Sequence, residues 1–104
     1  MSYTTINPAT GENIDCYAVM SDEEVESIIS STHLAYSAWR CVPISERQQL
    51  MLTLANVLRE RRQQCALLIT AEMGKTLASA KAEVEKCAWL CESYVEQATA
   101  VLQD

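Results

Sequence analysis

The scarcity of glycine is the feature that most limits the folds open to this chain: glycine occurs only twice in 104 residues, as Gly11 and Gly74. Phosphate-binding loops and dinucleotide-binding turns need several glycines close together, where the backbone approaches the phosphate. Neither type of motif can be written anywhere in this sequence. With only two prolines as well, the composition also excludes collagen-like, low-complexity and turn-dense all-β proteins.

The first twenty residues have the composition of a short β-hairpin. Residues 3–6 and 13–19 are rich in β-branched and aromatic side chains, which is typical of strands. Between them, Asn7 and Pro8 open a turn, and Gly11 can adopt the positive φ needed where the chain leaves it. An isolated hairpin is marginally stable in water, so we expect residues 1–20 to lie against another part of the chain.

Residues 21–104 are predicted to be helical throughout, beginning with a strong start signal. Ser21 and Glu24 have the spacing of a capping box. An apolar stripe with the helical period follows, and Pro43 places the end of this first helix near residues 40–42. The stripe comprises Val25, Ile28, Ile29, Thr32, Tyr36 and Trp39.

Two further helices are predicted after Pro43. Ser45 and Gln48 have the spacing of a second capping box, and Gly74 is the expected left-handed end of that helix. The last helix is expected from about residue 76 to residue 102. Short links between helices favour antiparallel neighbours. The predicted fold is therefore mainly α: a short hairpin (1–20) followed by three antiparallel helices (21–104), together one structural unit.

The last helix carries the strongest periodic signal in the sequence. Trp89 falls opposite the centre of its apolar stripe, where it is either a scattered exposed side chain or part of a second contact surface. The stripe has apolar residues alternately three and four positions apart: Leu77, Ala80, Val84, Cys87, Cys91, Tyr94, Ala98 and Val101.

Charge and cysteine usage narrow the expected partners and compartment. Eight basic against 14 acidic residues give a net charge of −6, which argues against nucleic acid and anionic membranes as partners. The longest strongly apolar run, residues 65–69, is too short to cross a bilayer. The five cysteines are odd in number and no signal peptide is evident, so we expect free thiols in a cytoplasmic protein.

Three groups of residues could have a catalytic or binding role, but a structural role is favoured for each. Cys87 and Cys91 lie one helical turn apart, but a zinc site would need two more ligands, and buried free thiols are favoured. His33 could act as a base only beside a nucleophile, which no motif supplies. The basic cluster of residues 59, 61 and 62 could bind an anion, although a solvated helix face near Glu60 is favoured.

The ordered set of motifs resembles the amino-terminal portion of the aldehyde dehydrogenase family, with closest similarity to succinate-semialdehyde dehydrogenases. The resemblance extends over nearly the whole chain and departs at Thr76, where that branch usually has proline. It is carried by Asn7-Pro8-Ala9-Thr10-Gly11-Glu12 and Ile14, by Ala35-Tyr36 and Trp39, by Arg47, Leu50, Ala55 and Leu58, by Glu72-Met73-Gly74-Lys75, and by Ala80, Glu83 to Ala88, Cys91-Glu92 and Tyr94.

The resemblance implies a fragment of the α/β aldehyde dehydrogenase fold, from the first part of its cofactor-binding domain. The family oxidises aldehydes with NAD or NADP through a cysteine thioester, which a glutamate-activated water releases. The motifs of the nucleophilic cysteine, the glutamate, the oxyanion asparagine and the cofactor-binding turn have no counterpart here. We therefore expect no catalytic or cofactor-binding residues, no bound NAD or NADP, and no activity of the chain alone.

One functional element of the family has matching positions. In several members, backbone carbonyls before the Asn-Pro turn and a carboxylate near the Gly-Lys segment hold a monovalent cation. The matching residues are Thr5, Ile6 and Glu72, and oxygen ligands suit such an ion. The alternative is that Glu72 only caps the helix or pairs near Gly74 and Lys75.

Three hypotheses follow. The first is an inactive amino-terminal fragment of an aldehyde dehydrogenase, for which succinate semialdehyde is the expected substrate of the parent enzyme. The second is a helical module that docks on another chain or forms homo-oligomers through exposed apolar surface including Trp89. The third is a small redox or metal protein that uses Cys87 and Cys91.

Overall fold

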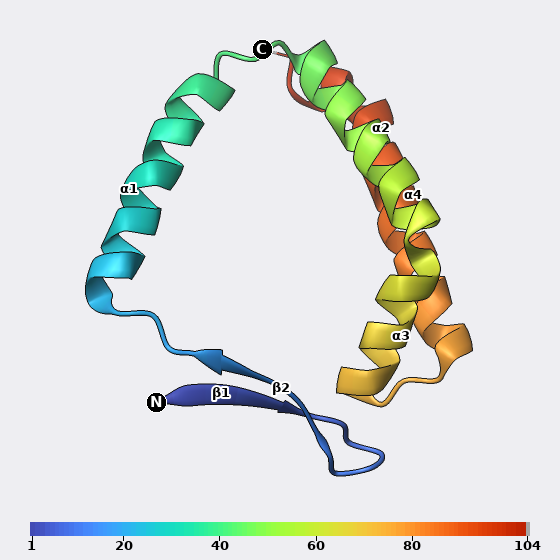
Figure 1. The fold of residues 1–104 in the computed structure, drawn as a ribbon. Helices are drawn as coiled ribbons and strands as arrows, with labels where there is room; N and C mark the ends of the chain where they lie inside the picture. Colours follow the sequence, from blue (N-terminus) through green and yellow to red (C-terminus); the bar gives the residue numbers. More distant parts are fainter. Residues whose placement is uncertain (104) are drawn as a thin grey trace.

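A computed structural model describes residues 1–103 and contains a two-stranded hairpin followed by four helices. The elements are β1 (Ser2–Ile6), β2 (Asn13–Ala18), α1 (Asp22–Trp39), α2 (Ile44–Glu60), α3 (Arg62–Met73) and α4 (Leu77–Val101) (Figure 1). The mainly helical fold with an amino-terminal hairpin is confirmed.

The hairpin forms where the turn residues predicted it. β1 and β2 are antiparallel, with Ser2 opposite Ala18 and an irregularity in register after Thr5. Asn7 organises the turn: its carbonyl accepts from the Gly11 N–H at 2.8 Å, and its side-chain oxygen accepts from the Ala9 N–H at 2.9 Å. Gly11 has a φ of +76°, as the turn requires.

The segment predicted as one helix before Gly74 is two helices. Arg61, with φ −93° and ψ 10°, separates α2 from α3, although its N–H still donates to the Val57 carbonyl. The second capping box is wrong. The helix begins at Ile44 directly after Pro43, so Ser45 lies inside the first turn and does not cap it. Gln48 instead donates from its side-chain amide to the Val95 carbonyl of α4 at 2.8 Å.

The core lies where α4 runs antiparallel along α2 and α3. Its buried residues are small, which allows the helix axes to approach closely. Of the stripe predicted on α4, Cys87, Tyr94 and Val101 are exposed, and Ala88 is buried in place of its neighbour Cys87. The buried residues of the described chain are Ala55, Ala66, Ala80, Val84, Ala88 and Cys91.

Helix α1 stands apart from this bundle. Every residue of α1 is exposed, so the expectation that it packs as an antiparallel neighbour of the following helix is wrong. Figure 1 shows an open arch, with α1 on one side, α2 and α4 on the other, and the hairpin between their lower ends. The radius of gyration is 18.1 Å, whereas a compact chain of this length would have about 13 Å.

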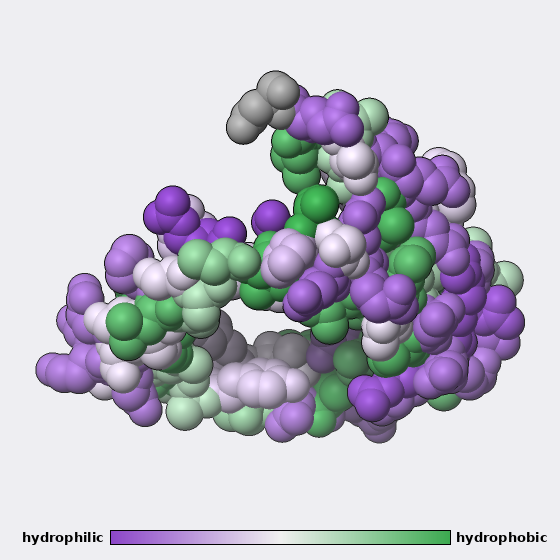
Figure 2. All heavy atoms as spheres, turned by 90° about the horizontal axis from the view of Figure 1, so that it is seen from above, coloured by the Kyte–Doolittle hydropathy of each residue, from purple (hydrophilic) through white to green (hydrophobic). Residues whose placement is uncertain are grey.

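Apolar side chains are correspondingly exposed. Figure 2, viewed along the arch from above, shows hydrophobic residues on the surface around its opening. Among residues 1–103, none of the helices is both long and apolar enough to cross a membrane.

Candidate functional site

The hairpin turn rests against the carboxyl end of α3. Gly74 ends this helix in the left-handed conformation, with φ +72°, and its N–H donates to the Thr70 carbonyl at 3.1 Å. A Cβ atom at Gly74 would lie 3.0 Å from Cγ of Pro8. The absence of a side chain at Gly74 therefore serves both the helix end and the close approach of the turn, and the hairpin does lie on another part of the chain.

The three residues proposed for a cation lie on the elements that form this junction. Thr5 and Ile6 end β1, and Glu72 is in the last turn of α3. The pKa of Tyr17 on β2 is raised by the carboxylate of Asp15, then by desolvation, and least by the carboxylate of Glu72. No three or more His, Cys, Asp or Glu side chains gather as metal ligands among residues 1–103. Cation binding by the two backbone carbonyls and Glu72 stays a prediction.

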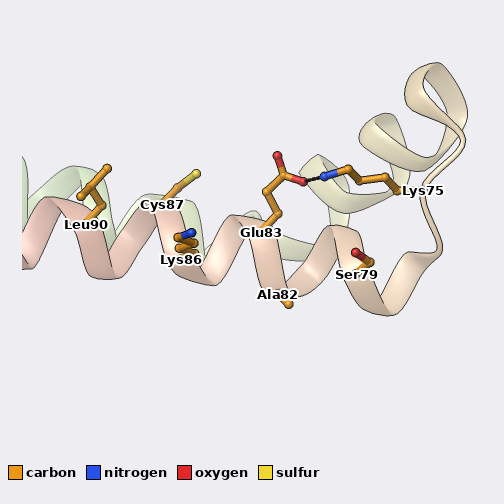
Figure 3. Close-up of a pocket in the computed structure, with 7 residues that line it drawn as sticks. All are labelled: Lys75, Ser79, Ala82, Glu83, Lys86, Cys87 and Leu90. Atoms are coloured by element: carbon orange, nitrogen blue, oxygen red, sulfur yellow. Dashed lines mark hydrogen bonds and ion pairs between the residues drawn. The ribbon is translucent and has the colours of Figure 1, made fainter.

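Lys75 lies in the link between α3 and α4, and its ion-pair partner is Glu83 of α4. The ammonium of Lys75 and the carboxylate of Glu83 form an ion pair across the link between α3 and α4 (Figure 3). The pair borders a shallow groove on α4 that is also lined by Ser79, Ala82, Lys86, Cys87 and Leu90.

The cysteines are all free thiols, but they differ in environment. Cys91 is buried as a small apolar residue, whereas Cys87 is exposed in the groove. His33 lies on α1, which stands apart from α4 (Figure 1), so the fold does not place this histidine beside either thiol. The exposed Cys87 therefore lacks a neighbouring histidine, the usual activating base of a catalytic thiol.

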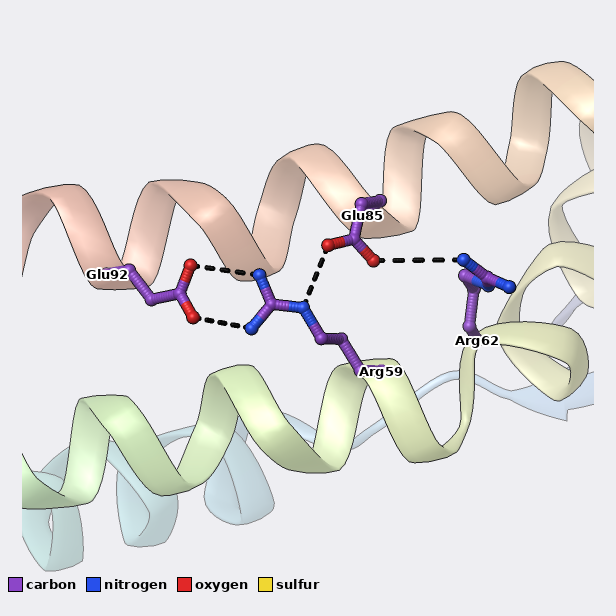
Figure 4. A network of polar contacts seen from close by, with 4 residues as sticks. All are labelled: Arg59, Arg62, Glu85 and Glu92. Carbon is purple, nitrogen blue, oxygen red and sulfur yellow. Dashed lines mark hydrogen bonds and ion pairs between the residues drawn. The ribbon is translucent and has the colours of Figure 1, made fainter.

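Two residues of the basic cluster, Arg59 and Arg62, belong to a network that joins α2 and α3 to α4 (Figure 4). Arg59 donates from Nε to Glu85 at 2.8 Å and from Nη2 to Glu92 at 2.9 Å, while Arg62 lies 3.9 Å from Glu85. The hydrogen bonds that Arg59 donates to Glu92, and then the one that it donates to Glu85, raise the pKa of Arg59. Arg59 in turn lowers the pKa of Glu92.

This network is the polar feature that the sequence interpretation missed. Both carboxylates are distant in sequence from Arg59, so only the packing of the helices reveals the pairing. The available signal was the seven-residue spacing of Glu85 and Glu92, which places them on one face of a helix. Because the arginine fork is occupied by carboxylates of the same chain, the network fits a role in holding α2 on α4 better than anion binding.

Comparison with known proteins places these features in one family. The aldehyde dehydrogenase family matches residues 1–104. The chain is 39% identical to succinate-semialdehyde dehydrogenase [NADP(+)] 1 of Mycobacterium tuberculosis over 100% of this chain and 23% of the relative. It is 36% identical, with the same coverage, to a probable succinate-semialdehyde dehydrogenase [NADP(+)] of Synechocystis.

A solved structure agrees with this assignment. The succinic semialdehyde dehydrogenase of Streptococcus pyogenes, in complex with NADP+, superposes with a TM-score of 0.90 and 32% identity. The match covers 97% of this chain and 22% of the solved one. The chain thus spans less than a quarter of the length of these relatives. Since the family match extends over every residue, the chain belongs to the aldehyde dehydrogenase family and corresponds to an amino-terminal portion of it.

Proposed function

We propose that this chain is the amino-terminal part of an NADP-linked succinate-semialdehyde dehydrogenase and is inactive by itself. The observation that carries the proposal is the match of the whole chain to enzymes of that activity, of which it spans 23%. The described residues add a helix junction, a groove and an ion-pair network, and His33 lies on a helix that stands apart from Cys87 and Cys91.

A chimera tests this proposal. In it, the chain replaces the matching region of the Mycobacterium tuberculosis enzyme, and oxidation of succinate semialdehyde is followed by the absorbance of the reduced nicotinamide. We expect the chimera to be active with NADP+ and the chain alone to be no more active than a mock preparation. Turnover by the chain alone, or a folded but inactive chimera, would contradict the proposal.

Self-association is a second candidate function, and the exposed outer face of α4 favours it. Trp89 is 58% exposed, and its neighbours Leu90 and Tyr94 are exposed as well. These three side chains line a shallow hollow with Ser93 and Gln97. Clustered exposed aromatic and aliphatic side chains are typical of contact surfaces.

Sedimentation of the chain at several concentrations tests self-association. We expect the average mass to rise with concentration and the rise to weaken in Trp89→Ala. Leu34→Ala, which removes another exposed apolar side chain but on α1, is the matched control. A monomer at all concentrations, or equal effects of both substitutions, would exclude the Trp89 surface as the contact.

A further inference from the structure

Helix α1 has a well-formed apolar face that nothing in the described chain covers. Around the helix, the side chains of residues 25, 28, 29, 32, 36 and 39 fall within an arc of about 100°, the width of a face that normally packs on a core. All of them are exposed. The opposite side carries Glu23, Ser27, Ser30 and Leu34, so it is mostly polar.

The helix itself is securely specified despite its lack of packing. Ser21 accepts from the Glu24 N–H at 3.2 Å, and Glu24 accepts from the Ser21 N–H at 2.7 Å, which completes the capping box. The three acidic residues of the first turn also complement the helix dipole. Local interactions therefore form α1, but no buried side chain fixes its position relative to the bundle.

The position of α1 is nevertheless shared with a solved enzyme. Helix α1 contains 18 of the 104 residues, so a structural match that covers 97% of the chain must include it. A TM-score of 0.90 indicates that α1 has a similar position relative to the bundle in the Streptococcus pyogenes enzyme. In that enzyme the matched region is only 22% of the chain.

We propose that the apolar face of α1 is a docking surface for the part of the aldehyde dehydrogenase subunit that lies outside these 104 residues. This inference rests on the proposed function. It commits to the remainder of the subunit as the occupant, because the relatives add more than three times this length and the solved Streptococcus pyogenes enzyme has a similar open arrangement in the matched region. Held against that remainder, α1 buries its apolar face; without it, the bundle of α2, α3 and α4 keeps its own core and α1 is unsupported.

Hydrogen exchange of the backbone amides tests the proposal in the chain alone and in the chimera described above. We expect the amides of residues 25–39 to exchange at least about tenfold more slowly in the chimera than in the chain alone. Amides around Ala55 and Ala88 serve as the internal control, because these residues are already buried within the chain alone. Equal exchange of residues 25–39 in the two proteins overturns the proposal, and so does protection in the chain alone that accompanies dimers in sedimentation.

A pair of substitutions in the chimera assigns the protection to the apolar face. Ile28→Asp places a charge in the proposed contact and is expected to restore fast exchange at residues 25–39. Ser30→Asp introduces the same group on the polar side and is expected to leave exchange slow. Equal effects of the two substitutions contradict the proposal. An inactive chimera with residues 25–39 protected contradicts only the proposed function, so the two failures are distinguishable.

Discussion

At the scale of single residues, comparing the two glycines distinguishes the cost of a left-handed backbone from the cost of a steric contact. Both have positive φ, but a Cβ at Gly74 would press on Pro8 whereas a Cβ at Gly11 would meet nothing within 4 Å. Alanine at either position should cost about 1 kcal/mol from the left-handed backbone. Gly74→Ala should therefore destabilise the chain more than Gly11→Ala in urea unfolding, by the cost of displacing the turn.

A double substitution checks the cause of that difference. Pro8→Ala removes Cγ, the atom of Pro8 that the new methyl group would meet at 3.0 Å, so it should recover part of the loss in a Gly74→Ala background. If the two single glycine variants are equally stable, or if the double variant recovers nothing, the turn does not rest on Gly74 as described.

Arg59 should make the stability of the bundle depend on pH. Because Arg59 lowers the pKa of Glu92 in the folded chain, this pair stabilises the fold above the ordinary pKa of a glutamate. That stabilisation is lost as the pH falls through the lowered pKa. Arg59→Met should reduce the urea midpoint at pH 7 and flatten its decline on acidification, with a smaller effect in about 1 M salt.

Arg62→Met is the matched control for this network. Its guanidinium lies 3.9 Å from Glu85, beyond hydrogen-bond distance, whereas Arg59 donates to both carboxylates. We expect the Arg62 variant to keep nearly the wild-type pH profile. Equal profiles for the two variants would show that the bidentate contact contributes nothing beyond general charge.

At the scale of elements, features that depend on neighbouring residues were predicted correctly from the sequence, and features that depend on packing were not. The Ser21 cap, the turn at Asn7 and the left-handed end at Gly74 depend on neighbours within a few residues, and all three are confirmed. The break at Arg61 has no glycine or proline to mark it. The burial of Ala88 in place of Cys87 depends on how α4 rotates against α2 and α3, which no local pattern encodes.

The candidate site divides in the same way. The sequence placed Thr5, Ile6 and Glu72 together only through resemblance to a family, and the structure puts their elements at one junction. The pairing of Arg59 with Glu85 and Glu92 was missed, since it joins helices across 26 and 33 residues of chain. Contacts between segments distant in sequence are not visible in local patterns, which also explains why α1 was expected to be an antiparallel neighbour of α2. A short link favours antiparallel neighbours, but it does not require the two helices to pack.

The cap of α1 is the element whose strength is easiest to measure. Ser21→Ala removes the side-chain oxygen that accepts from the Glu24 N–H, which typically costs about 1 kcal/mol. We expect faster amide exchange at residues 22–25 and a small loss of helicity by circular dichroism. Ser27→Ala, within the same helix but away from its start, should leave exchange there unchanged; acceleration by both variants would point to general fraying instead.

At the scale of the whole molecule, net charge and exposed apolar surface have opposite effects on the association of one copy of the chain with another. A net charge of −6 repels one copy of the chain from another, while the open arch leaves large apolar side chains in contact with water. Salt weakens the first effect, because the screening length falls from about 14 Å near 0.05 M to about 4 Å near 0.5 M, and does not weaken the second. The average mass from light scattering should therefore rise with salt for the chain alone.

The chimera, in which the face of α1 is expected to be covered, should show a much smaller rise. A mass that stays constant or falls with salt would mean that ion pairs, rather than the exposed apolar surface, govern association of this chain.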